Sequence, residues 1–234
     1  MNYSRDGKTA RVAVLCLFGV VFFAATSGSA FAQNLATNPR FNGNATPWVL
    51  NLSSSPQPAG LGASAYNAAL DVDGQVGTSG SLQLDVTATT PTGTGDAEVA
   101  ATECVAIPGG LQPVTEANYG ARLRVPSGNP TDGLLSASVE VRFFSDGACN
   151  TPIDDAGESQ GRTLGAGVPD DAFWYTLSDP AFIPASSLAA ASMQVRLAVL
   201  KLADTGNAAT VQFDNVYVSV NGTTPIQLQH FEVE

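Results

Sequence analysis

The alternation of apolar and polar residues predicts β-strands along most of the chain, and residues 211–220 show it most fully. One face of this stretch holds Val216, Val218 and Val220, with Asp214 in line. The other face holds Val211, Phe213 and Tyr217. Apolar residues on both faces are typical of a strand covered on both sides, so we expect this strand at the centre of a packed sheet. The acid within it must be hydrogen-bonded, paired or bound to a cation.

Residues 118–125 and 135–144 alternate just as cleanly. The side chains expected to face water are Arg122, Arg124, Glu140 and Arg142. Because only the turn-rich residues 126–133 separate the two stretches, we predict that they pair as antiparallel neighbours with a shared polar face.

Shorter strands are predicted at residues 49–52, 65–72, 81–87, 97–107, 173–177, 182–183 and 193–199. Segments rich in Gly, Pro, Ser and Asn separate them, and no long helix is predicted. About nine antiparallel strands of this kind indicate an all-β sandwich or barrel.

Residues 150–171 interrupt the pattern and are predicted to form a long loop. Its acidic residues are Asp154, Asp155, Glu158, Asp170 and Asp171. Loops of this length are often functional, but the charge favours a solvated insertion.

The first 32 residues have the features of a cleaved signal peptide. Arg5, Lys8 and Arg11 precede an apolar run at residues 12–25, and the segment ends in Ala-Phe-Ala at Ala32. A membrane anchor is the alternative, but a spanning helix needs about 20 residues and the run is shorter. No later stretch is long and apolar enough to span a bilayer. We therefore predict a secreted or periplasmic protein.

Cleavage leaves 202 residues (234 less 32), which suit one β-sandwich domain at residues 33–220 and a polar tail at residues 221–234. Two small domains are the alternative. The remaining chain has 7 Lys and Arg (10 less 3) and 20 Asp and Glu (21 less 1), a net charge of −13. This charge disfavours nucleic acid and anionic membranes as partners, and it is typical of a soluble extracellular protein.

Two cysteines remain after cleavage, Cys104 and Cys149. Export favours a disulfide between them, and two free buried thiols are the alternative. A closed loop of this length stabilises a fold by roughly 4 kcal/mol.

Several short segments, in this order, resemble CenC-type carbohydrate-binding modules. They are Asn34-Leu35, Asn38 to Asn42, Trp48, Gly80 to Leu84, Trp174 with Phe182, and Phe213 to Val216. The resemblance implies a jelly-roll β-sandwich of the galactose-binding-like kind, with a structural calcium where the first segment meets the last strand. Asp214 matches the closing acid of the family. Asn42 falls where the family usually has Glu, and an amide is a poorer calcium ligand than a carboxylate.

Catalytic chemistry has little support in the sequence. The single histidine, His230, lies in the tail, and no nucleophile elbow, phosphate loop or His/Cys metal spacing is present. A pair of carboxylates could in principle hydrolyse a glycoside, but the only adjacent acid pairs, at residues 154–155 and 170–171, both fall in the predicted loop. We therefore predict a non-enzyme that requires no cofactor.

Two functions remain after catalysis is set aside. The first is a non-catalytic module that binds a neutral extracellular polysaccharide. The second is a secreted structural or adhesive sandwich with no small-molecule site. Trp48 and Trp174 occupy positions that are structural in the resembled family, so the aromatics left for a sugar platform are Tyr66, Phe144, Tyr175 and Tyr217. The sequence assigns no ligand-binding residue and no oligomeric state.

Overall fold

The computed structural model describes residues 33–53, 60–75, 77–87, 97–129, 135–164, 168–178, 181–201 and 208–222. The predicted signal peptide, the tail beyond residue 222 and His230 lie outside the described residues. Within the described ranges, no helix is long and apolar enough to cross a membrane.

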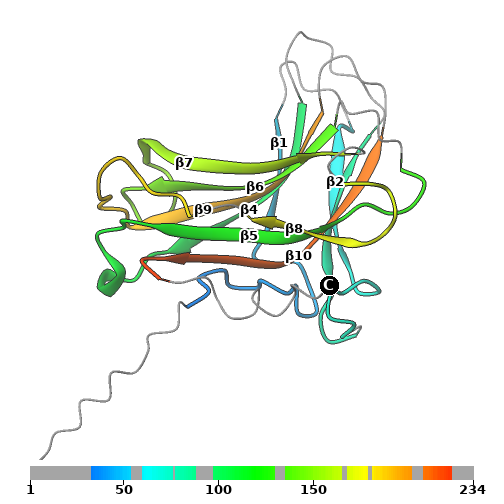
Figure 1. Cartoon of the computed structure of the whole chain (residues 1–234), viewed down its shortest axis with the longest axis horizontal. Helices are drawn as coiled ribbons and strands as arrows, with labels where there is room; N and C mark the ends of the chain where they lie inside the picture. The colour runs from blue at the N-terminus through cyan, green and yellow to red at the C-terminus, as the bar shows by residue number, and fades with distance from the viewer. Residues whose placement is uncertain are drawn as a thin grey trace, which may run out of the picture.

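Ten strands form two antiparallel sheets in the described chain, which confirms the all-β prediction (Figure 1). Sheet A has the order β1-β4-β9-β6-β7, and sheet B has the order β2-β3-β10-β5-β8. The strands are β1 Val49–Ser53, β2 Gly62–Asn67, β3 Ser81–Val86, β4 Ala97–Ala106, β5 Ala117–Arg124, β6 Leu135–Phe144, β7 Pro152–Thr163, β8 Trp174–Ser178, β9 Ser192–Lys201 and β10 Ala209–Val220. A short 3-10 helix, η1, covers Gly109–Leu111.

The strand order is that of a jelly roll. β3 to β10 alternate between the sheets except at β6–β7, so sheet A contains the row β4-β9-β6-β7 and sheet B contains β3-β10-β5-β8. β1 extends sheet A beside β4, and β2 extends sheet B beside β3. The inward positions of both sheets form one hydrophobic core, in which Leu84, Leu123, Val139, Leu197 and Phe213 are fully buried.

The predicted pairing of residues 118–125 with residues 135–144 is wrong. β5 pairs with β10 and β8 in sheet B, whereas β6 pairs with β9 and β7 in sheet A. Each strand offers one apolar face, and two such faces bury more area when they meet across a core than when they lie side by side. The polar residues of the two strands therefore lie on opposite outer surfaces of the sandwich.

The predicted loop at residues 150–171 instead contains the long edge strand β7. It pairs with β6 over most of its length, which satisfies backbone groups that β6 would otherwise expose. β7 is mostly polar because it lies at an edge, and it contributes few apolar side chains such as Ala156 to the core. An apolar pattern therefore could not reveal it. β2 also ends at Asn67 rather than Val72, and Phe182 makes only an isolated bridge to Ala117.

The central position predicted for residues 211–220 is confirmed, but the predicted faces are only half right. The register of β10 on β5 shifts between Asp214 and Tyr217, and Asn215 has a φ of 45°. This β-bulge exchanges the faces of the strand. The core therefore receives Val211 and Phe213 before the bulge and Val216, Val218 and Val220 after it.

The N-terminal segment at residues 34–41 continues sheet B where β3 ends. The Leu35 amide donates to the Val218 carbonyl and the Val216 amide to the Pro39 carbonyl, both at 2.8 Å. The Thr37 amide donates at 2.8 Å to Glu103 on sheet A. The segment therefore ties the two sheets together.

Cys104 and Cys149 form the predicted disulfide, with their Cα atoms 6.0 Å apart. It joins β4 to the turn between β6 and β7. The Asp146 carboxylate shapes this turn by accepting the amides of Ala148, Asn150 and Thr151.

Candidate functional site

Asp214 lies at the bulge of β10, and its side chain is 0% exposed. Its Oδ2 accepts the Val72 amide at 2.9 Å, and its Oδ1 accepts the Asn215 amide at 2.6 Å. The expectation that this acid is hydrogen-bonded is therefore confirmed. Two residues farther along β10, the Val216 amide donates to Pro39 of the N-terminal segment.

Other charged groups surround this carboxylate. Burial, with smaller contributions from Asp71 and Asp73, raises the pKa of Asp214 to about 7, although the two amides oppose the rise. Arg122 lies near Asp73 and Asp214, and burial lowers the pKa of its guanidinium. Asp214 is therefore a buried acid whose charge depends on pH in the neutral range.

The residues implicated in calcium binding do not form a ligand set in the described chain. Both Asp214 oxygens face N–H donors, which is the arrangement of a hydrogen-bond acceptor rather than of a cation ligand. Asn42 is exposed, and its amide donates at 2.7 Å to Asn38. No group of three or more His, Cys, Asp or Glu side chains in the described ranges could hold a metal ion. Calcium binding at Asp214 and Asn42 stays a prediction.

Of the acid pairs considered for catalysis, Asp170 and Asp171 lie in the bend that precedes β8. The Asp170 carboxylate accepts the Gly128 amide, and the Asp171 carboxylate accepts the Phe173 amide and the Tyr175 hydroxyl. Asp171 therefore stabilises its own turn, and Asp170 joins that turn to the segment after β5. The side chains of Asp154 and Asp155 lie outside the described residues.

The outer face of sheet B carries a row of polar side chains. Gln83 on β3 is in register with Gln212 on β10, and Gln212 is in register with Arg124 on β5. Their neighbours along each strand point into the core, so these three side chains point away from it. Asn67 on β2 completes the row, which we call the polar ladder.

Hydrogen bonds connect the members of the polar ladder from β2 to the edge of β8. Gln83 Oε1 accepts from Asn67 at 3.2 Å and from Gln212 at 3.4 Å. Gln212 Oε1 accepts from Arg124, whose Nε donates at 2.8 Å to the Ala172 carbonyl. The ladder therefore places amide and guanidinium groups in a line across the strands.

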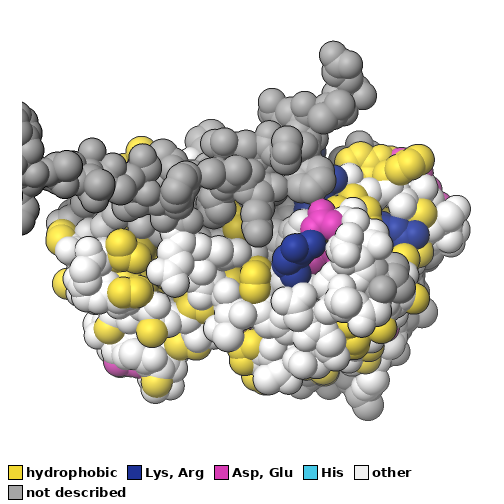
Figure 2. Space-filling model, turned by 90° about the horizontal axis from the view of Figure 1, so that it is seen from below, with side chains coloured by type: hydrophobic (Ala, Val, Ile, Leu, Met, Phe, Trp, Pro, Cys, Tyr) yellow, Lys and Arg dark blue, Asp and Glu magenta, His cyan; other side chains and the backbone are white. Residues whose placement is uncertain are grey.

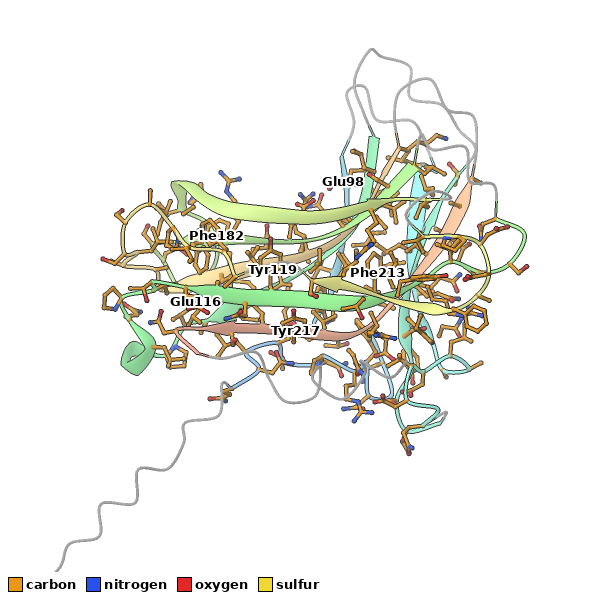
Figure 3. All side chains as sticks on the ribbon, viewed as in Figure 1. Glu98, Glu116, Tyr119, Phe182, Phe213 and Tyr217 are labelled. Carbon is orange, nitrogen blue, oxygen red and sulfur yellow. A yellow bond between two sulfur atoms is a disulfide. The ribbon has the colours of Figure 1, made fainter. Side chains whose placement is uncertain are left out.

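The aromatic residues proposed for a platform are mostly packing residues. Tyr217 and Phe144 are buried, and Tyr66 and Tyr175 pack partly against the core. The Tyr217 ring lies directly on Gly120, where an added Cβ would be 2.4 Å from the ring. Figure 3 shows Tyr217 on β10 and Tyr119 on the neighbouring strand β5.

The two tryptophans differ in their environments. Trp48 is buried beside Phe41, with ring centroids 5.8 Å apart. Trp174 is half-buried, and its register with Arg124 places it on the outer face of sheet B. A half-buried aromatic therefore lies beside one end of the polar ladder.

Charged and hydrophobic side chains are distributed differently on the side of the molecule seen from below in Figure 2. Figure 2 shows acidic and basic side chains together at one place, with hydrophobic side chains scattered over the described surface.

Sequence reasoning missed the polar ladder and one exposed aromatic, Phe173. The outward direction of Gln83 and Arg124 follows from alternation, but their alignment depends on which strands pair. The exposure of Phe173 depends on the turn before β8, and alternation carries no signal for it.

No protein-family model matches the chain, and no curated protein matches it in sequence. Solved structures do match it. Several of the matching structures are of carbohydrate-binding modules.

One such structure concerns carbohydrate-binding modules from the β-sandwich superfamily, at 13% identity and a TM-score of 0.47. The match covers 77% of this chain, which spans 61% of that one. Another is the C-terminal family 22 module of Clostridium thermocellum Xyn10B, at 15% identity and a TM-score of 0.47, with 84% and 98% of the chains covered. A third is an α-L-arabinofuranosidase, MgGH51, at 14% identity and a TM-score of 0.45, covering 82% of this chain and 27% of that one.

Proposed function

We propose that the protein is a secreted, non-catalytic module that binds a neutral extracellular polysaccharide on the outer face of sheet B. The observation that carries the proposal is the polar ladder of Asn67, Gln83, Gln212 and Arg124, which ends beside Trp174. The sequence resemblance to CenC-type modules and the predicted signal peptide support it.

The chemistry of the ladder suits sugar hydroxyls. A hydroxyl both donates and accepts, and a side-chain amide offers two donors and an acceptor. Asn67, Gln83 and Arg124 are half-buried, so their positions are restricted while part of each remains accessible. Groups fixed in this way lose little conformational entropy when a ligand binds.

The net charge of −13 after signal removal makes neutral glycans the preferred class, because acidic glycans are repelled. Most aromatic side chains are used for packing, so little apolar surface is left for stacking. We therefore expect dissociation constants in the micromolar to millimolar range, or about −4 to −8 kcal/mol.

Affinity electrophoresis of residues 33–234 in gels containing neutral or acidic polysaccharides tests the proposal. Gln83→Ala removes the central acceptor of the ladder and should abolish the retardation caused by a neutral glycan. Gln194→Ala is the matched control, because Gln194 is a half-buried glutamine on the outer face of sheet A. Equal retardation of both variants would place any glycan site elsewhere.

One observation favours the structural or adhesive alternative. Gln212 is 3% exposed, so this member of the ladder contacts neighbouring side chains and leaves almost no surface for a ligand. Absence of retardation across all neutral glycans would support that alternative.

A further inference from the structure

Asp85 lies on β3 two residues after Gln83, so its side chain is on the same outer face of sheet B as the polar ladder. The residues on either side of it, Leu84 and Val86, belong to the core. Asp85 is half-buried, and its register partner on β10 is Thr210. The carboxylate is therefore next to the ladder, although it is not one of the members of the ladder.

The hydrogen bonds of Asp85 determine which way the neighbouring amide points. Both carboxylate oxygens accept Gln83 Nε2 at 3.0 Å, and Oδ1 also accepts the Thr210 hydroxyl at 2.7 Å. A carboxylate can accept hydrogen bonds but cannot donate them. Gln83 must therefore turn its NH2 group toward Asp85 and its oxygen toward Asn67 and Gln212.

The same direction continues along the ladder to Arg124. Gln83 Oε1 accepts Gln212 Nε2 at 3.4 Å, and Gln212 Oε1 accepts Nη1 of Arg124. A guanidinium group can only donate. A group that only donates therefore stands at one end of this chain and a group that only accepts at the other, and every hydrogen bond between them runs from Arg124 toward Asp85.

The reverse orientation of the amides is unfavourable. If Gln83 turned over, its oxygen would face the Asp85 carboxylate and its NH2 group would face the NH2 groups of Asn67 and Gln212. These partly or fully buried groups would then lose their partners, which costs free energy. The bonds to the charged ends are stronger than bonds between neutral groups, and neighbouring bonds in a chain polarise one another. The two charges therefore hold both glutamines in one orientation.

We propose that Asp85 is a positioning residue of the glycan site, which fixes the direction of the Gln83 and Gln212 amides and so determines which groups of the ladder donate to a sugar hydroxyl and which accept from it. This inference rests on the proposed function. An amide that turns over freely offers a donor or an acceptor at the same point, and it must be ordered when a ligand binds. A fixed direction removes that cost and makes the pattern of donors and acceptors specific.

Nuclear magnetic resonance of 15N-labelled protein, residues 33–234, tests the orientation without a glycan. Asp85→Asn replaces a group that only accepts with an amide that can face either way, so both glutamines gain a second orientation. The side-chain amide signals of Gln83 and Gln212 should therefore shift or broaden, although Gln212 is one hydrogen bond farther from Asp85. Asp85→Glu should keep the wild-type signals, because its carboxylate still only accepts. An unchanged Gln212 side-chain signal in Asp85→Asn would overturn the inference.

Isothermal titration of the same proteins with cellohexaose, xylohexaose, laminarihexaose and mannohexaose tests the role in binding. For the hexasaccharide that binds tightest, Asp85→Asn should weaken binding roughly tenfold, which is the size expected from one hydrogen bond. Asp85→Glu should bind like wild type. The matched control is Glu98→Gln, which also removes one negative charge. Glu98 is a half-buried acid on the outer face of sheet A, where it pairs with Arg196, so this variant should bind like wild type.

The outcomes separate the positioning role from the proposed function. A wild type that binds one hexasaccharide, with Asp85→Asn binding equally well, overturns the role of Asp85 and leaves the proposed function standing. A wild type that binds none of the four overturns the proposed function and, with it, the role of Asp85 in binding. Equal weakening by Asp85→Asn and Glu98→Gln overturns the inference as well, since it would indicate an effect of net charge.

Discussion

Replacing Asp214 with Asn tests how the buried acid stabilises the fold. Its two oxygens accept the amides of Val72 at 2.9 Å and Asn215 at 2.6 Å. The Asn side chain keeps one acceptor oxygen, so one of the two amides loses its partner. An unsatisfied donor beside a buried side chain costs roughly 1–3 kcal/mol, and we expect a loss of this size at a pH where Asp214 is protonated.

The pH dependence gives a sharper test. Burial raises the pKa of Asp214 from 3.8 to about 7. Because the folded state binds this proton more tightly than the unfolded state, the contribution to stability is fully present below the unfolded pKa. It is lost as the pH rises through about 7. A tenfold change in proton affinity corresponds to about 1.4 kcal/mol, so this rise in pKa makes the loss up to about 4 kcal/mol.

Urea unfolding of the disulfide-bonded protein at about pH 5 and about pH 8 measures the effect. Wild type should be more stable at the lower pH, and Asp214→Asn should lack most of this difference. The variant should therefore be less stable than wild type at the lower pH and approach or exceed it at the higher pH. Identical pH dependence of the two proteins would refute the assignment of the buried proton to Asp214.

Three further predictions concern other contacts. Glu103 is 2% exposed, and burial raises the pKa of its carboxyl group. Glu103→Gln should therefore also reduce the loss of stability with rising pH, measured by urea unfolding as above. An unchanged dependence of the unfolding free energy on pH would contradict this prediction. The Cys104–Cys149 disulfide joins cysteines that are 45 residues apart in sequence. Replacing both cysteines with Ser should lower the free energy of unfolding by roughly 4 kcal/mol. An unchanged urea midpoint would contradict this prediction. If calcium binds at Asp214 and Asn42 as predicted, a chelator should lower the melting temperature of wild type but not of Asp214→Ala. An unchanged melting temperature of wild type would contradict the calcium site.

Alternation in the sequence was enough to predict the all-β class, most strands and the central place of β10. It succeeded where one face of a strand is buried, as in β6, whose bounds match the prediction. It failed for β7, because an edge strand that is largely solvated has no apolar period. Local pattern also could not determine partners, so β5 and β6 were assigned to one sheet although they face each other across the core.

The candidate site was harder to predict than the fold for the same reason. The polar ladder joins Asn67, Gln83, Gln212 and Arg124, which are far apart in sequence and meet only through the jelly-roll strand order. Asp214 was predictable as a buried acid because a carboxylate within an apolar strand needs partners. One of its hydrogen-bond donors, the Val72 amide, was not predictable. Val72 was predicted to end a strand, but that strand ends at Asn67 and Val72 lies beyond it.

The bulge in β10 links the candidate site to the structure that supports it. Before the bulge, Gln212 faces outward and pairs in register with Gln83 on β3. After it, Val216 and Val218 face the core, and their backbone groups bond to the N-terminal segment that replaces β3 beside the strand. Without the bulge, the side chains of one half of the strand would lie on the wrong face of the sheet, because a shift of one residue moves every side chain to the opposite face. The buried carboxylate of Asp214 accepts the amide of the bulged residue Asn215, so the residue that we expect to stabilise the fold contacts the bulge that joins the two halves of the strand.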